Sequence, residues 1–186
     1  GKKISVDSAN LMNKVFEVIE ANKIFNFNKK KYKIIIHPQS YIHSIVRFKN
    51  GLTKMILYET DMRIPISNTL FGVRNNVYNN DEIKIDKLNN ISFHKVDTKK
   101  FPSILLIDKC LNMGPSASTI VNACNEVLVN LFLEGKITFL DIVKKINKIF
   151  KDKDFKKYAK RKPNSVQSIY LIDNWARLKT INMCVK

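Results

Sequence analysis

The spacing of apolar residues predicts an amphipathic helix near the start of the chain. A stripe at helical spacing is formed by Leu11, Val15, Val18 and Ile19. Asp7 and Ser8 precede this stripe, and both residue types favour the N-cap position of a helix. We therefore expect a helix that begins near these two residues and ends by about Asn26.

The apolar segments that follow predict β-structure. Residues 32–36 have the composition of a buried strand. Residues 44–49 alternate in character and lead to Asn50-Gly51. That pair is typical of a two-residue type I′ turn, because both central positions of the turn take a positive φ. Residues 52–58 are then expected to return antiparallel.

Helices are predicted after this hairpin and throughout the last part of the chain. Pro65 suits the first position of a helix, which we expect to run to about residue 73. Beyond residue 100, cap and stop residues delimit four segments: 101–111, Ser116 or Ser118 to Leu133, Thr138 to Phe150, and one that follows Asn164 or Ser165. Their short connections and single apolar faces indicate a small bundle.

Together these elements predict a fold of class α/β (α+β), followed by an all-α region. Residues 1–78 are expected to form a mixed portion with a hairpin-containing sheet, and residues 101–186 an all-α C-terminal four-helix bundle. Residues 79–100 are polar and rich in Asn, Asp and Lys. We interpret them as a surface linker, with a short extended piece at residues 83–85.

The composition is that of a globular chain with a basic surface. The 186 residues are 45% hydrophobic and carry a formal net charge of +17. The lysines are scattered, and heavy use of Lys, Asn and Ile follows AT-rich codons, so a solvated basic surface is favoured over a nucleic-acid interface. Nucleic acid is therefore not expected as a partner. No apolar run reaches the ~18 residues of a membrane span, so a membrane is not expected as a partner either.

The cysteines indicate a reducing compartment. Cys110, Cys124 and Cys184 are widely spaced and form no CxxC pair. This argues against a zinc ribbon and against a disulfide-stapled secreted domain, and it favours the cytoplasm. The chain begins at Gly1 without a methionine, so we expect it to be a piece of a longer polypeptide.

The segment from Ser5 to Glu17 is a candidate binding site for an anion and a metal. The start of a helix attracts anions, and Ser8, Asn13 and Lys14 add a hydroxyl, an amide and a positive charge there. Asn10, with Asn13, Lys14 and Glu17, is expected on one polar face, where the Glu17 carboxylate could bind Mg²⁺ or Mn²⁺. Residue types alone favour the ordinary alternative, an amphipathic helix with a solvated polar face.

Two further clusters combine polar side chains with expected turns. His37 and His43 flank a strand-to-turn junction, and His can shuttle protons or bind an anion, although a structural role is more common. Residues 59–65 follow a strand and precede a helix, where binding loops often lie, and an acidic turn with a helix cap explains them equally well. The chain contains no GxGxxG or P-loop motif, so it carries no dinucleotide-binding signature.

Four segments taken together resemble one enzyme family. They are Lys-Lys-Ile-Ser-Val-Asp-Ser-Ala-Asn-Leu-Met-Asn-Lys at residues 2–14, Ile-His-Pro-Gln-Ser-Tyr-Ile-His-Ser at 36–44, Asp-Met-Arg-Ile-Pro-Ile at 61–66 and Asn-Ala-Cys-Asn-Glu at 122–126. In order and spacing they are similar to the 1-deoxy-D-xylulose 5-phosphate reductoisomerase family. The resemblance extends over nearly the whole chain and is more specific than any one motif.

The resemblance implies an activity, cofactors and an assembly. The family uses NADPH and Mg²⁺ or Mn²⁺ to rearrange and reduce 1-deoxy-D-xylulose 5-phosphate to 2-C-methyl-D-erythritol 4-phosphate in non-mevalonate isoprenoid biosynthesis, and fosmidomycin inhibits it. Its members are homodimers whose subunits contain a cofactor domain, a catalytic domain and a helical C-terminal domain. A bacterial cytoplasm is implied, or alternatively a plastid. Residues 1–78 would then be the second half of the catalytic, substrate- and metal-binding domain.

The resemblance also assigns roles to individual residues. It implies that the substrate is bound by Ser8, Asn13, Lys14, Glu17 and His43. It also implies that the catalytic residues are His43, Lys14 and Glu17. Glu17 matches one carboxylate of the metal site. Met62 matches a residue that packs on the nicotinamide, and Val15 stands beside the nicotinamide where the family has glycine.

The family's cofactor domain and its other two metal ligands would precede Gly1, so this chain is expected to be inactive alone. It would supply one metal ligand and a phosphate clasp, the set Ser8, Asn13 and Lys14. Two alternatives remain at this point: a basic polyanion-binding module without catalysis, and a decayed or truncated gene product.

Overall fold

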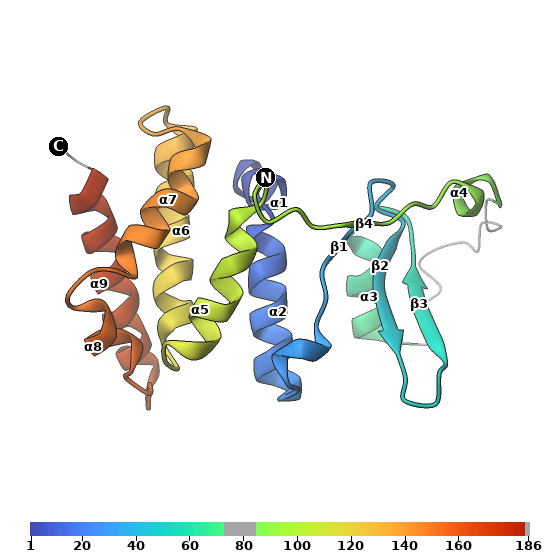
Figure 1. Cartoon of the computed structure of the whole chain (residues 1–186), viewed down its shortest axis with the longest axis horizontal. Coiled ribbons are helices and arrows are strands. Elements are labelled where there is room, and N and C mark those ends of the chain that lie inside the picture. The colour runs from blue at the N-terminus through green and yellow to red at the C-terminus, as the bar shows by residue number, and fades with distance from the viewer. Residues whose placement is uncertain (73–84, 185–186) are drawn as a thin grey trace. The chain divides into compact units, whose positions relative to one another are not determined.

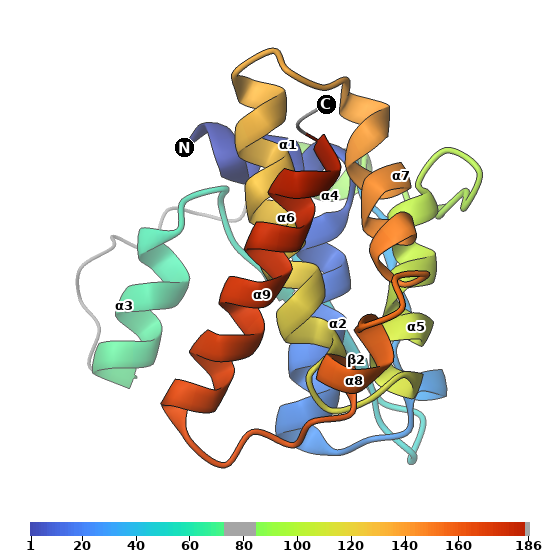
Figure 2. The ribbon, with the colours of Figure 1, turned by 90° about the vertical axis from the view of Figure 1, so that its left-hand side faces the viewer.

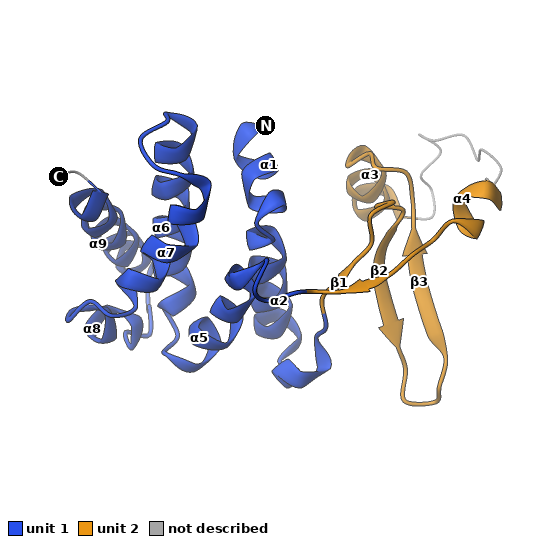
Figure 3. Ribbon diagram, turned by 45° about the horizontal axis from the view of Figure 1, so that its top comes forward, with its two compact units in different colours: residues 1–33, 97–186 blue, residues 34–96 orange. Residues whose placement is uncertain are grey.

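The computed structural model describes residues 1–72 and 85–184 (Figure 1, and from a second side Figure 2). The chain divides into two compact units, coloured separately in Figure 3. Unit 1 combines residues 1–33 with residues 97–186, and unit 2 is the segment 34–96 between them. Within the described residues, no helix is both long enough and apolar enough to cross a membrane.

Unit 1 is helical. Its elements are α1 (Lys2–Ala9), α2 (Met12–Phe25), η1 (Lys29–Lys31), η3 (Pro102–Leu105), α5 (Leu106–Asn112), α6 (Ala117–Leu133), α7 (Phe139–Ile149), α8 (Phe155–Ala159) and α9 (Val166–Cys184). Helix α6 is central, since it packs against α1, α5, α7, α8 and α9, and Figure 2 shows α9 running beside it. Ile120 and Leu128 of α6 are fully buried. The apolar face of α6 therefore forms the middle of the core.

Unit 2 contains two small antiparallel sheets and two helices. Strand β1 (Ile35–Ile36) pairs with β4 (His94–Lys95), and β2 (Ile42–Arg47) pairs with β3 (Thr53–Leu57). The helices are α3 (Arg63–Phe71) and α4 (Ile85–Asn89). Among the described residues of unit 2, no hydrophobic side chain is buried.

The predicted fold class is confirmed, and the helices expected beyond residue 100 are present. The first of them begins as the 3₁₀ segment η3, and the sequence did not predict the short helix α8. Thr138 caps α7 as expected, in a capping box with Asp141, in which each side chain bonds to the backbone N–H of the other residue.

The first helix was predicted wrongly at its start and in its middle. Helix α1 begins at Lys2 rather than near Asp7 or Ser8, and the chain then breaks before α2 begins at Met12. Leu11 at the break has a φ of +61°, a left-handed conformation that is uncommon for a residue with a side chain. The Asp7 carboxylate is used in a contact with another helix, so it does not cap a helix start.

The hairpin was predicted correctly, but its turn was not. The backbone N–H of Phe48 bonds to the carbonyl of Leu52 at 2.8 Å, and that of Gly51 bonds to the carbonyl of Phe48 at 3.1 Å. Gly51 has a positive φ (+89°), whereas Asn50 does not. The loop therefore has three residues with glycine at its left-handed position, instead of the two-residue type I′ turn.

Other boundaries also differ from the prediction. The strand expected at residues 32–36 is limited to Ile35–Ile36. Helix α3 begins at Arg63, two residues before Pro65, because the Asp61 carboxylate accepts a hydrogen bond from the Arg63 backbone N–H at 2.9 Å.

The two compact units divide the chain at residues 33/34 and 96/97, and the domain boundaries expected at residues 78 and 100 stay a prediction. The physical reason is that α1 packs on α6 and α2 packs on α5, which joins the first helices to the C-terminal ones. Residues 79–84 of the expected linker, and all but Ile85 of the extended piece at 83–85, lie outside the described residues. Ile85 begins α4, and β4 follows, so the described part of the linker has regular structure of its own.

Candidate functional site

The break between α1 and α2 forms the centre of the predicted binding segment. Asn10 is 6% exposed, and its Oδ1 atom accepts a hydrogen bond from the Met12 backbone N–H at 2.9 Å. Its backbone carbonyl accepts a hydrogen bond from the hydroxyl of Ser103 in η3. Asn10 thus points into unit 1 and fixes the break, so the prediction that it shares an exposed polar face was wrong.

The three residues predicted to form the phosphate clasp lie across this break. The Nδ2 atom of Asn13, at the start of α2, donates to the Oγ atom of Ser8, in the last turn of α1, at 2.9 Å. Ser8 and Lys14 are exposed, and Asn13 is half-buried. The hydroxyl, the amide and the ammonium group are therefore presented near the start of α2, where the helix dipole favours an anion.

Lys14 and Glu17 form an ion pair on the exposed side of α2. The Nζ atom of Lys14 lies 2.9 Å from Oε1 and 2.7 Å from Oε2 of Glu17. About half of each side chain is exposed, at 48% and 55%, and such pairs contribute little to stability because water and salt screen them. A phosphate that competes for Lys14, or a cation that competes for Glu17, therefore has little to displace.

His43 lies on β2 of unit 2 and is held by two tyrosines. Its ring stacks on the ring of Tyr58, with centroids 3.6 Å apart and planes 10° apart. Its Nδ1 atom lies 3.1 Å from the carbonyl oxygen of Tyr41, a contact in which Nδ1 carries the hydrogen. In the neutral ring the Nε2 atom is then the basic nitrogen, able to take up a proton.

Met62 precedes α3 and is 69% exposed, which is an open position for an apolar contact. The turn around it is braced by Asp61, whose carboxylate accepts hydrogen bonds from Nε of Arg63 at 3.1 Å and 2.9 Å and from its Nη2 at 2.6 Å. These bonds hold the pKa of Asp61 below its ordinary value.

Val15 does not share the exposure of its neighbours. It is fully buried on the core-facing side of α2. Val15 therefore has a packing role in unit 1, and the cofactor contact expected at this position stays a prediction. The helical stripe that includes Leu11 and Ile19 already pointed to this role.

The predicted residues are divided between the two units. Ser8, Asn13, Lys14 and Glu17 belong to unit 1, whereas His43 and Met62 belong to unit 2. Within residues 1–72 and 85–184, no group of three or more His, Cys, Asp or Glu side chains could hold a metal ion. Glu17 therefore offers a single carboxylate, and the described residues do not complete a metal site.

Sequence reasoning missed a buried polar pair beside the clasp. Asp7 is 3% exposed, and its Oδ1 atom accepts a hydrogen bond from Nδ2 of Asn125 in α6 at 2.8 Å. Burial raises the pKa of the Asp7 carboxyl, and the bond from Asn125 and the charge of Lys3 act in the opposite direction. The signal was an aspartate directly before the clasp serine, paired with the second Asn of the segment 122–126.

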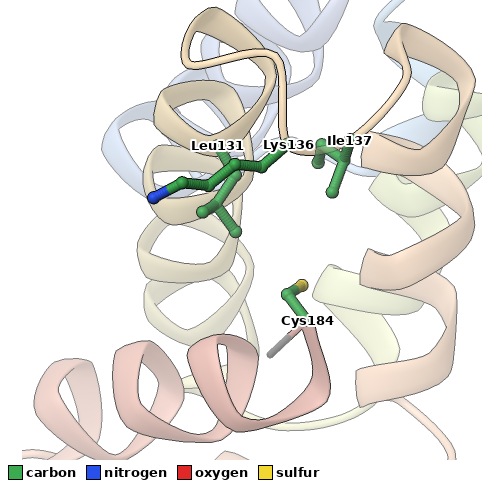
Figure 4. Close-up of a pocket in the computed structure, with 4 residues that line it drawn as sticks. All are labelled: Leu131, Lys136, Ile137 and Cys184. Atoms are coloured by element: carbon green, nitrogen blue, oxygen red, sulfur yellow. The ribbon is translucent and has the colours of Figure 1, made fainter. Parts of the chain in front are cut away.

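A pocket of about 330 Å³ lies elsewhere in unit 1 (Figure 4). It is lined by Leu131, Lys136, Ile137 and Cys184, and none of the predicted site residues contributes to it. Apolar atoms dominate this lining, with one amine and one thiol. It offers no counterpart to the clasp.

Comparisons with known proteins agree along the chain. A family model described as the DXP reductoisomerase C-terminal domain matches residues 57–179, and one described as the 1-deoxy-D-xylulose 5-phosphate reductoisomerase C-terminal domain matches residues 1–25. The reductoisomerase of Pelagibacter ubique (strain HTCC1062) is 42% identical over 185 residues, which are 100% of this chain and 48% of that protein. That of Wolbachia pipientis wMel is 41% identical and covers 96% of this chain and 45% of its own length.

Solved structures carry the same name. The Zymomonas mobilis 1-deoxy-D-xylulose 5-phosphate reductoisomerase in complex with NADPH has a TM-score of 0.87 at 34% identity, covering 99% of this chain and 47% of that one. A DOX-P reductoisomerase in complex with NADPH, fosmidomycin and magnesium has a TM-score of 0.90 at 28% identity, covering 99% and 46%. The chain spans about half the length of the relatives it matches. The chain therefore belongs to the 1-deoxy-D-xylulose 5-phosphate reductoisomerase family.

Proposed function

We propose that this chain is the substrate-binding part of an NADPH-dependent reductoisomerase, which converts 1-deoxy-D-xylulose 5-phosphate to 2-C-methyl-D-erythritol 4-phosphate. The observation that carries the proposal is the clasp across the α1–α2 break, where Asn13 and Ser8 are hydrogen-bonded and Lys14 is exposed beside them. In this role the clasp binds the substrate's phosphate.

Each clasp residue suits a different demand of a phosphate dianion. Lys14 provides a full charge, and charge-assisted hydrogen bonds to phosphate are among the stronger polar contacts. Asn13 has a second amide hydrogen, and the Ser8 hydroxyl can rotate to donate. The exposed Lys14–Glu17 pair exchanges easily, so the ammonium can turn to the ligand.

The same proposal gives unit 2 its role. His43, with its ring fixed by Tyr58, approaches the substrate and can exchange a proton at Nε2. The exposed Met62 packs against the nicotinamide. Residues 1–78 then belong to the catalytic domain, and residues 101–186 form the helical C-terminal domain. We extend the proposal to a homodimer in the bacterial cytoplasm.

NADPH and Mg²⁺ or Mn²⁺ belong to the proposal through the relatives, one of which is described in complex with NADPH, fosmidomycin and magnesium. Glu17 would donate one carboxylate oxygen to the metal, whose chemistry is to polarise substrate oxygens. The described residues hold no group that could complete the metal site, and the chain has no glycine-rich dinucleotide loop. The other metal ligands and the cofactor-binding loop must lie outside the described residues of this chain. The steps assigned to this chain are therefore substrate binding, substrate orientation and proton exchange.

The test is the affinity for fosmidomycin in the presence of Mg²⁺, measured by calorimetry on the polypeptide that carries this chain. Lys14→Ala is expected to lower the affinity about tenfold or more, because a charge-assisted contact is worth ~1.5–3 kcal/mol. Lys23→Ala is the matched control, since Lys23 lies in the last turn of the same helix, and it is expected to leave the affinity unchanged.

Equal affinities of the two variants would remove Lys14 from the site. Failure of the unsubstituted protein to bind fosmidomycin, together with steeply salt-dependent RNA binding, would favour the basic polyanion-binding module instead.

A further inference from the structure

The buried pair of Asp7 and Asn125 connects the clasp to the C-terminal helices. Asp7 lies in the last turn of α1, one residue before Ser8, and Asn125 lies in the middle of α6. The two side chains meet at 2.8 Å, and both residues are almost fully buried, at 3% and 0% exposure. A single hydrogen bond between distant parts of the sequence thus fixes the turn that presents Ser8.

The other side of the break is fixed from a different element. Ser103 of η3 donates to the backbone carbonyl of Asn10, and Asn10 in turn accepts from the Met12 backbone N–H. Asn125 and Ser103 therefore hold the chain at Asp7 and at Asn10, next to the clasp residues Ser8 and Asn13. The geometry of the clasp depends on contacts that lie outside the clasp itself.

The pair is poorly suited to a purely stabilising role. Removing a carboxylate from water has a large cost, and a well-packed apolar pair of similar volume is often as stable or more stable. In addition, the Oδ1 atom of Asn125 and the Nδ2 atom of Asn10 are buried without a hydrogen-bond partner in the described part of the chain. Buried polar groups of this kind call for an explanation other than stability.

Charged side chains near the Asp7–Asn125 pair form a network of ion pairs that joins α1, α6 and α9. Lys3 of α1 lies 3.0 Å from Glu126 of α6, next to Asn125 in the sequence. Arg177 of α9 bonds to Glu126 and also to Asp173, the latter at 2.6 Å. The register of α1 against α6 and α9 is therefore set by polar contacts, which are directional, as well as by apolar packing.

We propose that Asp7 is a positioning residue for the phosphate clasp, and that its hydrogen bond from Asn125 keeps Ser8 within reach of Asn13 and of the bound phosphate. This proposal rests on the proposed function of the clasp. It extends the site into the helical C-terminal domain, because the partner of Asp7 belongs to α6. Asp7 and Asn125 themselves do not touch the ligand.

The test exchanges the two groups. Asn125→Asp places a second carboxylate against Asp7, which removes the donor and adds repulsion, and it is expected to weaken fosmidomycin binding about tenfold. Asp7→Asn keeps an acceptor for Asn125 and is expected to cost about threefold or less. In the double variant Asp7→Asn/Asn125→Asp the new amide can donate to the new carboxylate, so affinity is expected to return to within about threefold of the unsubstituted protein.

Two controls separate positioning from general stability. Ile172→Ala removes a core side chain of α9 that is 1% exposed and is expected to lower the melting temperature without changing the affinity of the folded protein. All affinities are compared at a temperature at which the fluorescence of Trp175, the one tryptophan of the chain, reports a folded unit 1.

The outcomes are distinguishable from failure of the proposed function, which the effect of Lys14→Ala tests independently. If Lys14→Ala weakens binding but folded Asn125→Asp binds as tightly as the unsubstituted protein, Asp7 does not position the clasp. A double variant that binds no better than Asn125→Asp also overturns the proposal. If Asn125→Asp does not fold, the double variant decides alone: recovery of both folding and affinity supports the pairing, and recovery of folding without affinity contradicts the positioning role.

Discussion

The interior of unit 1 and the interior of unit 2 are stabilised by different kinds of interaction. Unit 1 buries a continuous apolar core centred on α6, whereas the described part of unit 2 buries no hydrophobic side chain. In unit 2 the ordering contacts are polar or aromatic: Gln39 bonds to the Asn90 carbonyl at 2.7 Å, and His43 stacks on Tyr58. The comparison teaches that the clasp residues are supported by a packed apolar core, while the hairpin that carries His43 is ordered mainly by local contacts.

The largest expected effect tests this contrast directly. Leu128→Ala removes a fully buried side chain of α6 and is expected to lower the free energy of unfolding by about 2–5 kcal/mol. Ile56→Ala, at a position on β3 that is 53% exposed, is expected to stay within about 0.5 kcal/mol. Urea unfolding followed by the fluorescence of Trp175, which lies in unit 1, measures the first variant, and amide hydrogen exchange in β2 and β3 measures the second. Similar losses for the two variants would mean that unit 2 has an apolar core after all.

Two glycines sharpen the comparison at the level of the backbone. A Cβ atom at Gly114 would lie 2.3 Å from the carbonyl oxygen of Ala159, and the φ of +136° is unfavourable for any side chain. Gly114→Ala is therefore expected to cost unit 1 more than about 2 kcal/mol. Gly51 has a φ of +89° but no atom within 4 Å of such a Cβ, so Gly51→Ala is expected to cost only about 1–2 kcal/mol of strain.

The two glycine variants require different measurements, because Gly114 belongs to unit 1 and Gly51 to unit 2. Gly114→Ala should shift the Trp175 unfolding transition, and Gly51→Ala should instead speed amide hydrogen exchange in β2 and β3. The contrast fails if Gly51→Ala shifts the Trp175 transition as much as Gly114→Ala does.

A smaller effect is expected at side chains that cap backbone groups. Thr138→Ala breaks the capping box of α7 and is expected to destabilise unit 1 by about 1 kcal/mol. Asn50→Ala removes the bond from the Leu52 backbone N–H to Asn50 Oδ1, 3.1 Å long, and is expected to loosen the hairpin turn by about 0.5–1 kcal/mol. Thermal unfolding measures the first and hydrogen exchange the second. No change in either variant would show that these caps are replaced by water.

The smallest expected effect is a pH dependence of the stability of unit 1. Hydrogen bonds from Arg177 and Lys3 hold the pKa of Glu126 below its ordinary value of 4.5, so its contribution to stability is present above pH 4.5 and is lost as pH falls through the folded-state pKa. Glu126→Gln should flatten the acid side of the stability profile.

Asp7 acts with the opposite sign. Burial raises its pKa above the ordinary 3.8, so its contribution declines as pH rises from 3.8 through the folded-state pKa. Asp7→Asn should therefore remove the loss of stability that accompanies a rise in pH above 3.8. Melting temperatures measured across the acid range test both Glu126→Gln and Asp7→Asn. A Glu126→Gln profile parallel to that of the unsubstituted protein would contradict the assignment.

Local sequence signals predicted the elements that local contacts determine. Thr138, which caps α7, and Gly135, which follows α6, mark helix ends that the structure confirms. The hairpin around Gly51 was also predictable. The break at Asn10 and Leu11 was not, because neither glycine nor proline marks it and Ser103 holds it from a distant part of the chain.

The candidate site also divides into features that the local sequence predicts and features that depend on distant contacts. Ser8, Asn13 and Lys14 were identified from their residue types and from the family resemblance, and the structure adds their hydrogen bonding across the break. The contact of Asp7 with Asn125 joins residues far apart in the sequence, and no periodicity predicts such a pair. The burial of Val15 agrees with its place in the helical stripe, and its contact with the nicotinamide stays a prediction.

The two-segment composition of unit 1 has a consequence for how the chain folds during synthesis. Residues 1–33 leave the ribosome well before α5 and α6, since all of residues 34–96 are made in between. At ~5–20 residues per second this interval lasts several seconds. During that time α1 and α2, with Val6, Met12 and Ile19, lack α5 and α6, the helices against which they pack in the folded unit. A chaperone that shields short apolar helices would therefore find its substrate in the segment that contains the proposed phosphate clasp.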